Sequence, residues 1–168
     1  MIANLSAFSA GQPIVHYFTQ PFWSYVITLG GGGATMGLCI LLLRSKSAEL
    51  KTLGKLSIGP AIFNINEPAT FGYPIMYNPT LAIPFVINPL ITMIICYFGY
   101  MVGFFKPAFT MITATLPVGV SPYLCTLSWT NILIPVIAFI VAWVVYRPFF
   151  KVYERDLIAK EQEAKEVA

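Results

Sequence analysis

Charged side chains are scarce in this chain of 168 residues. Asp, Glu, Lys and Arg together make up 10% of it and hydrophobic residues 57%, whereas an ordinary soluble domain carries about 25% charged residues. The mean hydropathy is +0.74, and too few charges are present to build a water-facing surface. The scarcity excludes an ordinary soluble domain and predicts an integral membrane protein.

Residues that bind metals or form disulfides are also few. The three cysteines lie far apart in apolar surroundings, without CxxC or Cys/His spacing: Cys39, Cys96 and Cys125. They indicate neither a metal site nor a disulfide framework, and we expect them to be small buried hydrophobic residues. The single histidine, His16, is expected in a loop or at the membrane interface, and a sugar ligand or proton relay is the alternative. No metal and no cofactor is predicted.

The charges that do occur are clustered. Apart from Glu67, they fall at residues 44–55, at Lys106, and from Arg147 to the end of the chain. This pattern is typical of segments that flank membrane spans and not of a nucleic-acid-binding surface. We therefore expect the chain to meet a lipid bilayer and no nucleic acid.

Three apolar stretches are long enough to cross a hydrocarbon core of about 30 Å as helices. They cover residues 22–43, 81–105 and 127–146. Basic residues follow the first and the last of them, and the positive-inside rule places those flanks in the cytoplasm. The sequence thus predicts an all-α membrane domain over residues 1–151, with about three transmembrane helices, and a cytoplasmic helical tail over residues 152–168.

Four consecutive glycines, residues 30–33, lie in the middle of the first stretch. Each weakens a helix by roughly 1 kcal/mol relative to alanine. One interpretation is close helix packing through small residues, since Gly33 and Gly37 form a small-xxx-small pair. The other is a break in the helix beside a substrate path.

Residues 58–80 are too apolar for a solvated loop and too rich in helix breakers for one helix. The breakers are Gly59, Pro60, Pro68, Gly72, Pro74 and Pro79. A re-entrant hairpin resolves the conflict, because irregular backbone is tolerated at membrane depth where it lines a cavity or is buried in protein. We expect the hairpin to enter from the cytoplasmic side, break near residues 66–68 and return to that side.

Glu67 is the only charged residue between Lys55 and Lys106. A lone carboxylate in a long apolar span is costly unless it lines a polar cavity or meets a ligand. Sugars need polar partners and aromatic surfaces, and both are nearby: Asn64, Asn66, Tyr73, Tyr77 and Asn78. Glu67 is therefore expected to bind a sugar hydroxyl and to help remove its proton during phosphoryl transfer. Alternatively, it is a structural carboxylate held by backbone N–H groups at a helix start.

The motifs around Glu67 resemble a known family. Residues 50–68, LKTLGKLSIGPAIFNINEP, are similar to the signature of EIIC, the permease subunit of phosphoenolpyruvate-dependent sugar phosphotransferase systems (PTS), in its lactose, cellobiose and diacetylchitobiose branch. GGGGAT at residues 30–35, AGQPIV at 10–15 and YRPFFKVYE at 146–154 resemble further parts of that branch. The resemblance covers essentially the whole chain but only the C-terminal part of a family member, so we expect a fragment of a permease.

The resemblance implies a bacterial cell-membrane permease that binds and translocates a β-linked disaccharide. It implies that Glu67 binds the sugar close to the hydroxyl that receives phosphate, with Asn64 and Asn66 as flanking site residues. The phosphate donor is then a phosphocysteine of the partner EIIB protein or domain, and no cysteine of this chain. A homodimer is implied for the full-length form.

The chain departs from the family pattern in two places. It has no IHG motif, which in the family lies well upstream and carries a second site histidine, so His16 is not taken as that histidine. PVGVSP at residues 117–122 stands where a PWTTPP-like motif is usual. An ion-coupled secondary transporter, with Glu67 as its proton or cation site, is the alternative function. A nonfunctional truncated remnant is a further alternative.

Overall fold

The computed structural model describes residues 1–24, 28–72, 78–113 and 115–167, with side chains as far as Glu163. Within these residues the secondary structure is helical and contains no strand. The all-α prediction is therefore confirmed.

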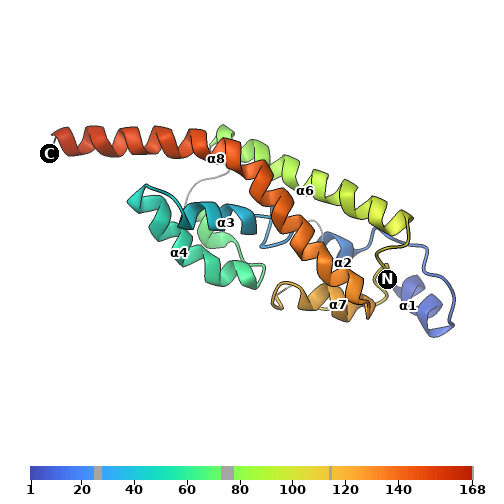
Figure 1. Ribbon diagram of the computed structural model, residues 1–168. Coiled ribbons are helices and arrows are strands. Elements are labelled where there is room, and N and C mark those ends of the chain that lie inside the picture. Colours follow the sequence, from blue (N-terminus) through green and yellow to red (C-terminus); the bar gives the residue numbers. More distant parts are fainter. Residues whose placement is uncertain (25–27, 73–77, 114, 168) are drawn as a thin grey trace.

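The helices differ greatly in length (Figure 1). In chain order they are α1 (Ile2–Ser9), α2 (Gln20–Phe22), α3 (Met36–Leu43), α4 (Ala48–Ile62), α5 (Glu67–Gly72), α6 (Pro79–Met101), α7 (Val120–Thr126), the 3-10 helix η3 (Trp129–Ile132) and α8 (Leu133–Val167). The long helices α6 and α8 pack against each other, and α3 packs against both α4 and α8. The C-terminal part of α8 extends beyond the other helices.

Among the described residues, two helices are long and apolar enough to cross a membrane. They are Pro79–Met101, and Trp129–Glu163 in α8 with the preceding η3, each with a mean hydropathy of 2.1 over its most apolar window. The first corresponds to the predicted span 81–105 and the second contains the predicted span 127–146. α8 continues as a helix through Pro148 to Val167, so no break separates the predicted membrane domain from the predicted tail. Their position in a bilayer stays a prediction.

Residues 22–43 do not form the single helix that the sequence predicts. α2 ends at Phe22, residues 25–27 lie outside the described part, and α3 begins only at Met36. Between them the backbone has positive φ at Gly30 (73°), Gly31 (99°) and Gly33 (76°), a conformation that glycine adopts without the usual steric cost. The glycine run therefore breaks the helix. Close packing occurs as well, since a β-carbon on Gly37 would lie 2.5 Å from the backbone nitrogen of Trp143 in α8.

The segment that contains Glu67 folds as a helical hairpin. α4 and α5 are its arms, and residues 63–66 form the turn. The turn precedes the expected break at residues 66–68 because Asn64 adopts the left-handed conformation, with φ of 60°, which asparagine tolerates better than most residues. The first arm also begins earlier than expected, at Ala48, within the basic segment. Tyr73, Pro74 and Tyr77 lie outside the described residues, and membrane re-entry stays a prediction.

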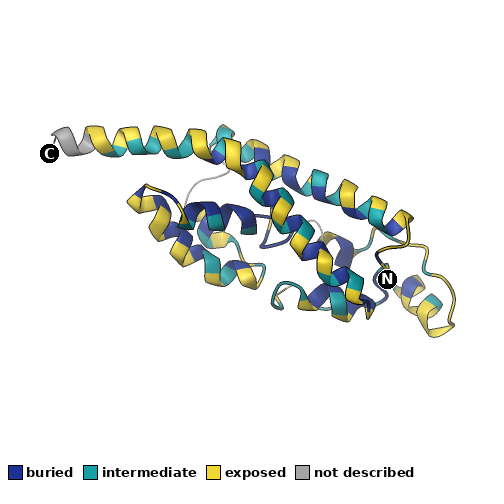
Figure 2. Cartoon of the chain, in the orientation of Figure 1, coloured by how far each residue is buried: buried dark blue, intermediate teal, exposed yellow. Residues whose placement is uncertain are grey.

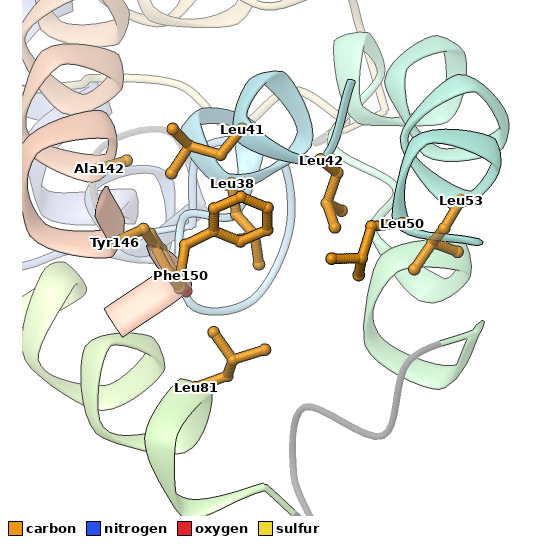
Figure 3. Packing of buried hydrophobic residues seen from close by; sticks show 9 residues of the cluster. All are labelled: Leu38, Leu41, Leu42, Leu50, Leu53, Leu81, Ala142, Tyr146 and Phe150. Atoms are coloured by element: carbon orange, nitrogen blue, oxygen red, sulfur yellow. The ribbon is translucent and has the colours of Figure 1, made fainter. Parts of the chain in front are cut away.

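The main core holds the hairpin against the long helices. Its nine buried residues come from α3, α4, α6 and α8 (Figure 3): Leu38, Leu41, Leu42, Leu50, Leu53, Leu81, Ala142, Tyr146 and Phe150. Tyr146 is fully buried among them. Figure 2 shows that burial decreases along the extension of α8, where Tyr153 and Leu157 still pack against the cluster. Burial, and the negative charge of Glu49, raise the pKa of the Tyr153 phenol to about 12.

Hydrogen bonds also join the α3–α4 loop to the extension of α8. Ser45 Oγ donates a hydrogen bond of 2.5 Å to Glu154 Oε1, which also accepts one of 2.8 Å from the backbone N–H of Lys46. Ser47 Oγ donates to Glu161 Oε1 at 2.5 Å and, as the N-cap of α4, accepts from the Leu50 N–H. We call this group, Ser45 and Ser47 with Glu154 and Glu161, the serine clamp.

Candidate functional site

The candidate site is organised by residues 30–35, which we call the glycine loop. The loop is closed by two internal bonds: Thr35 Oγ1 donates to the Gly30 carbonyl at 2.8 Å, and the Ala34 N–H donates to the Gly31 carbonyl at 3.1 Å. Ala34 and Thr35 are completely buried. With glycine at four successive positions, other side chains can approach the loop backbone directly.

The hairpin turn approaches the glycine loop with both of its asparagines. The Gly30 N–H donates to Asn64 Oδ1 at 2.8 Å, and Asn66 Nδ2 donates to the Gly32 carbonyl at 2.7 Å. A β-carbon on Gly31 would lie 2.3 Å from Asn66 Cγ, so only glycine leaves room for this side chain. Two segments 34 residues apart are thereby joined, and the asparagines that the sequence assigns to ligand binding also hold the turn in place.

The two long helices hold the same loop. From α6, Asn88 Nδ2 donates to the carbonyls of Gly33 and Ala34, at 3.1 and 3.2 Å. From α8, Tyr146 Oη donates to the Gly33 carbonyl at 2.9 Å. Phe85 packs directly against Gly33, where a β-carbon would be 2.3 Å from the ring. Sequence reasoning missed these contacts, although an asparagine alone in an apolar span is itself a sign of interhelical hydrogen bonding.

The segment that departs from the family pattern lies beside the hairpin turn. The Val118 N–H donates to the Ile62 carbonyl at 2.9 Å, at the end of α4. Val118 and Gly119 also line a shallow depression together with Asn64 and Leu29. Residues 117–122 thus contribute backbone and small side chains to the surroundings of the turn.

Glu67 follows directly after this fixed turn, as the first residue of α5. Its side chain is exposed, and within the described residues its carboxylate forms no hydrogen bond or ion pair. The reading of Glu67 as a structural carboxylate, satisfied by backbone N–H groups, therefore gains no support from these residues. The surrounding fold fixes the backbone of Glu67 and leaves its carboxylate available.

The other polar candidates have separate places. Asn78 Oδ1 accepts a hydrogen bond of 2.9 Å from the Thr80 N–H and so caps α6. His16 is exposed, and its carbonyl accepts a bond from Asn4 Nδ2 in α1. Neither side chain is joined to the glycine loop by a contact among the described residues. Across all the residues that the structure describes, no cluster of three or more His, Cys, Asp or Glu residues forms a metal site.

Comparison with known proteins settles the family. The sequence model of the phosphotransferase system EIIC component matches residues 1–89, more than half of the chain. The chain belongs to the PTS EIIC family. The resemblance drawn from the motifs around Glu67 is confirmed, and this EIIC chain is accordingly a membrane protein.

Individual relatives agree with this assignment. The lichenan permease IIC component of Bacillus subtilis (strain 168) is 42% identical over 97% of this chain and 37% of its own length. The cellobiose-specific EIIC component of Geobacillus stearothermophilus is 39% identical over 86% of this chain and 33% of its own length.

A solved structure shares the fold as well. The crystal structure of ChbC, the IIC component of the N,N'-diacetylchitobiose-specific system, matches with a TM-score of 0.91 and 38% identity, over 96% of this chain and 38% of ChbC. The chain thus spans little more than a third of the length of the relatives that it matches. The expectation that it corresponds to only part of a permease agrees with these shares.

Proposed function

We propose that this chain is the part of a PTS sugar permease that binds a β-linked disaccharide and presents it for phosphorylation by EIIB. Family membership supports the proposal, as do relatives named for lichenan, cellobiose and diacetylchitobiose. The proposed setting is the bacterial cell membrane, with α8 ending in the cytoplasm. The complete permease is proposed to act as a homodimer.

The observation that carries the proposal is the available carboxylate of Glu67 on an otherwise fixed turn. A charged group in apolar surroundings without a protein partner is costly. Within the described residues the fold gives Glu67 no partner. It nevertheless holds the preceding turn in place through the side chains of Asn64 and Asn66. A ligand hydroxyl that donates to Glu67 would supply the missing partner.

The geometry also suggests how the neighbours contribute. Asn66 uses Nδ2 for the Gly32 carbonyl, and no hydrogen bond among the described residues uses its Oδ1, which can accept from a second hydroxyl. Asn64 acts mainly by positioning the turn. Glu67 is proposed to accept a hydrogen bond from the sugar hydroxyl and to take its proton as phosphate arrives from EIIB.

Glu67→Gln in the complete permease tests this role. We expect sugar affinity, measured by isothermal titration with cellobiose and diacetylchitobiose, to fall about 10- to 100-fold, because a hydrogen bond to a charged group contributes roughly 1.5–3 kcal/mol. EIIB-dependent phosphorylation should be abolished. Glu49→Gln is the matched control, since it removes an exposed carboxylate from α4 in the same hairpin. Normal phosphorylation by the Glu67 variant would refute the assignment.

The same preparation separates the proposed function from ion-coupled transport. A phosphotransferase permease delivers a sugar phosphate and requires phosphorylated EIIB. Sugar uptake into vesicles without EIIB, driven by a pH gradient and lost in Glu67→Gln, would instead favour a proton-coupled carrier.

A further inference from the structure

An exposed apolar stripe runs along α8 and ends in two basic residues. The apolar members are Leu133, Val136, Ile140 and Val144, which are between 45% and 56% exposed. At 100° per residue they lie within an arc of about 80° on the helix. Arg147 and Lys151 continue the same line and are also exposed. One helix face therefore passes directly from apolar to positively charged.

The basic end of the stripe borders a hollow on the surface of α8. Trp143, Val144, Arg147, Pro148 and Lys151 line an open hollow of about 480 Å³. The Arg147 guanidinium lies 4.9 Å from the centre of the Trp143 ring, within range of a cation–π interaction. The indole is itself partly buried against the main core. The fold thus holds one cation in place before any ligand arrives.

The positive charge in the hollow is not neutralised within the described residues. Neither Arg147 nor Lys151 forms an ion pair there, and the nearest following acid on α8, Glu154, is engaged by Ser45 and the Lys46 backbone in the serine clamp. An anionic group that enters the hollow would meet two cations and no competing carboxylate.

The length of the stripe matches a lipid leaflet. Leu133 to Val144 spans eleven residue steps, about 16 Å along the helix axis. Half of a hydrocarbon core is about 15 Å thick. A phospholipid with its phosphate beside Arg147 and Lys151 can therefore lay one acyl chain along the apolar residues.

We propose that this face of α8 binds an anionic phospholipid, with the headgroup phosphate in the hollow between Arg147 and Lys151 and an acyl chain along Leu133–Val144. Charge complementarity and the continuous apolar stripe select a bilayer lipid as the occupant. A second copy or another part of the permease would have to bring an acid to the hollow and cover the stripe at the same time. The proposal depends on membrane insertion and is independent of the role of Glu67.

The charge requirement is tested with the double variant Arg147→Gln/Lys151→Gln. Each basic residue near an anionic surface favours binding about fivefold, so native mass spectrometry of the complete permease should show an about 30-fold loss of phosphatidylglycerol affinity. Affinity for phosphatidylcholine should be unchanged. Arg155→Gln/Lys160→Gln, which removes the same charges roughly 12 Å further along the helix, should change phosphatidylglycerol affinity by only a few-fold. Equal losses in both variants, or no lipid preference in the unmodified protein, would overturn the proposal.

The identity of the occupant is tested with Trp143 as the reporter. In the complete permease, Trp23, Trp129 and every tryptophan outside these 168 residues are replaced by phenylalanine, and retained helicity in circular dichroism confirms folding. In vesicles, phosphatidylglycerol with brominated acyl chains should quench Trp143 several-fold more strongly than brominated phosphatidylcholine, and Arg147→Gln/Lys151→Gln should remove the difference. Equal quenching by the two lipids would show that the site has no headgroup preference and would overturn the proposal. A Trp143 that neither lipid quenches would show that protein covers the face, and the proposal would be wrong.

Discussion

The two ends of the α3–α4 pair are fastened by different chemistry. At the hairpin turn, the bonds to the glycine loop come from neutral asparagine amides and backbone groups. At the opposite end, the serine clamp uses the carboxylates of Glu154 and Glu161. Both ends join segments far apart in the sequence, and only one of them uses charge.

The difference follows from the surroundings that each end meets. An ionised side chain is costly at membrane depth, where the hairpin turn is predicted to lie, whereas a side-chain amide forms hydrogen bonds without carrying a charge. The clamp lies beyond the apolar part of α8, among exposed basic and acidic residues, where carboxylates remain hydrated. Glu67 is the exception at the hairpin turn, since it is charged and has no structural task among the described residues. This contrast separates a carboxylate that has no structural partner among the described residues from carboxylates that hold the fold together.

The strongest test of the glycine-loop end is Gly33→Ala. The new β-carbon would need a left-handed backbone, which costs about 1–2 kcal/mol, and would press into the Phe85 ring, an overpacking cost of roughly 1–3 kcal/mol. We expect the thermal unfolding midpoint in detergent micelles to fall by roughly 5–15 °C. Gly32→Ala is the control, because its β-carbon would find Phe85 no closer than 3.6 Å. Equal effects of the two substitutions would contradict this account of the loop.

A double-mutant cycle tests the two side-chain hydrogen bonds that the Gly33 carbonyl accepts at the same end. Asn88→Leu and Tyr146→Phe each leave the Gly33 carbonyl with one donor, whereas the double variant leaves it with none. Each single change should cost about 1 kcal/mol, and the double variant should cost about 1–2 kcal/mol more than the sum, because a buried carbonyl loses its last partner. Thr92→Val combined with Tyr146→Phe should be additive, since Thr92 bonds only within α6. Additivity in both pairs would mean that the shared carbonyl does not couple the two helices.

The smallest effect is expected at the serine clamp. Glu154→Gln and Glu161→Gln retain an acceptor but lose its charge, and the partly exposed sites reduce the cost to roughly 0.5–1 kcal/mol each. The midpoint of thermal unfolding should fall by only about 1–4 °C, and protease sensitivity of the α3–α4 loop should rise. Glu163→Gln, on an exposed part of the same helix, should change neither. A loss as large as that of Gly33→Ala would erase the contrast between the two ends.

Local signals were sufficient for much of the fold. The apolar run after Pro79 predicts α6, and the prolines and glycines of residues 58–80 predict a broken hairpin. The end of the membrane domain at residue 151 was placed by charge alone, and α8 continues through that boundary. A proline such as Pro148 removes only one N–H donor, which a long packed helix can tolerate.

The glycine run and the asparagines show where sequence reasoning stops. Gly30 to Gly33 suited both a packed helix and a broken one, and the structure has the break because Asn64 and Asn66 approach from 34 residues away. The residue type of these asparagines indicates hydrogen bonding but cannot tell a ligand from a backbone partner. The roles of Glu67, Asn64 and Asn66 in sugar binding stay predictions.

Because α8 is one continuous helix, a small tilt at one end displaces the other end by a larger distance. Its 35 residues extend over about 52 Å, and Val167 lies about 32 Å beyond Tyr146, which touches the glycine loop. A tilt of about 5° at that contact would displace the free end of the helix by about 3 Å. A small change at the glycine loop would thus become a displacement of several ångströms at the C-terminal end of α8.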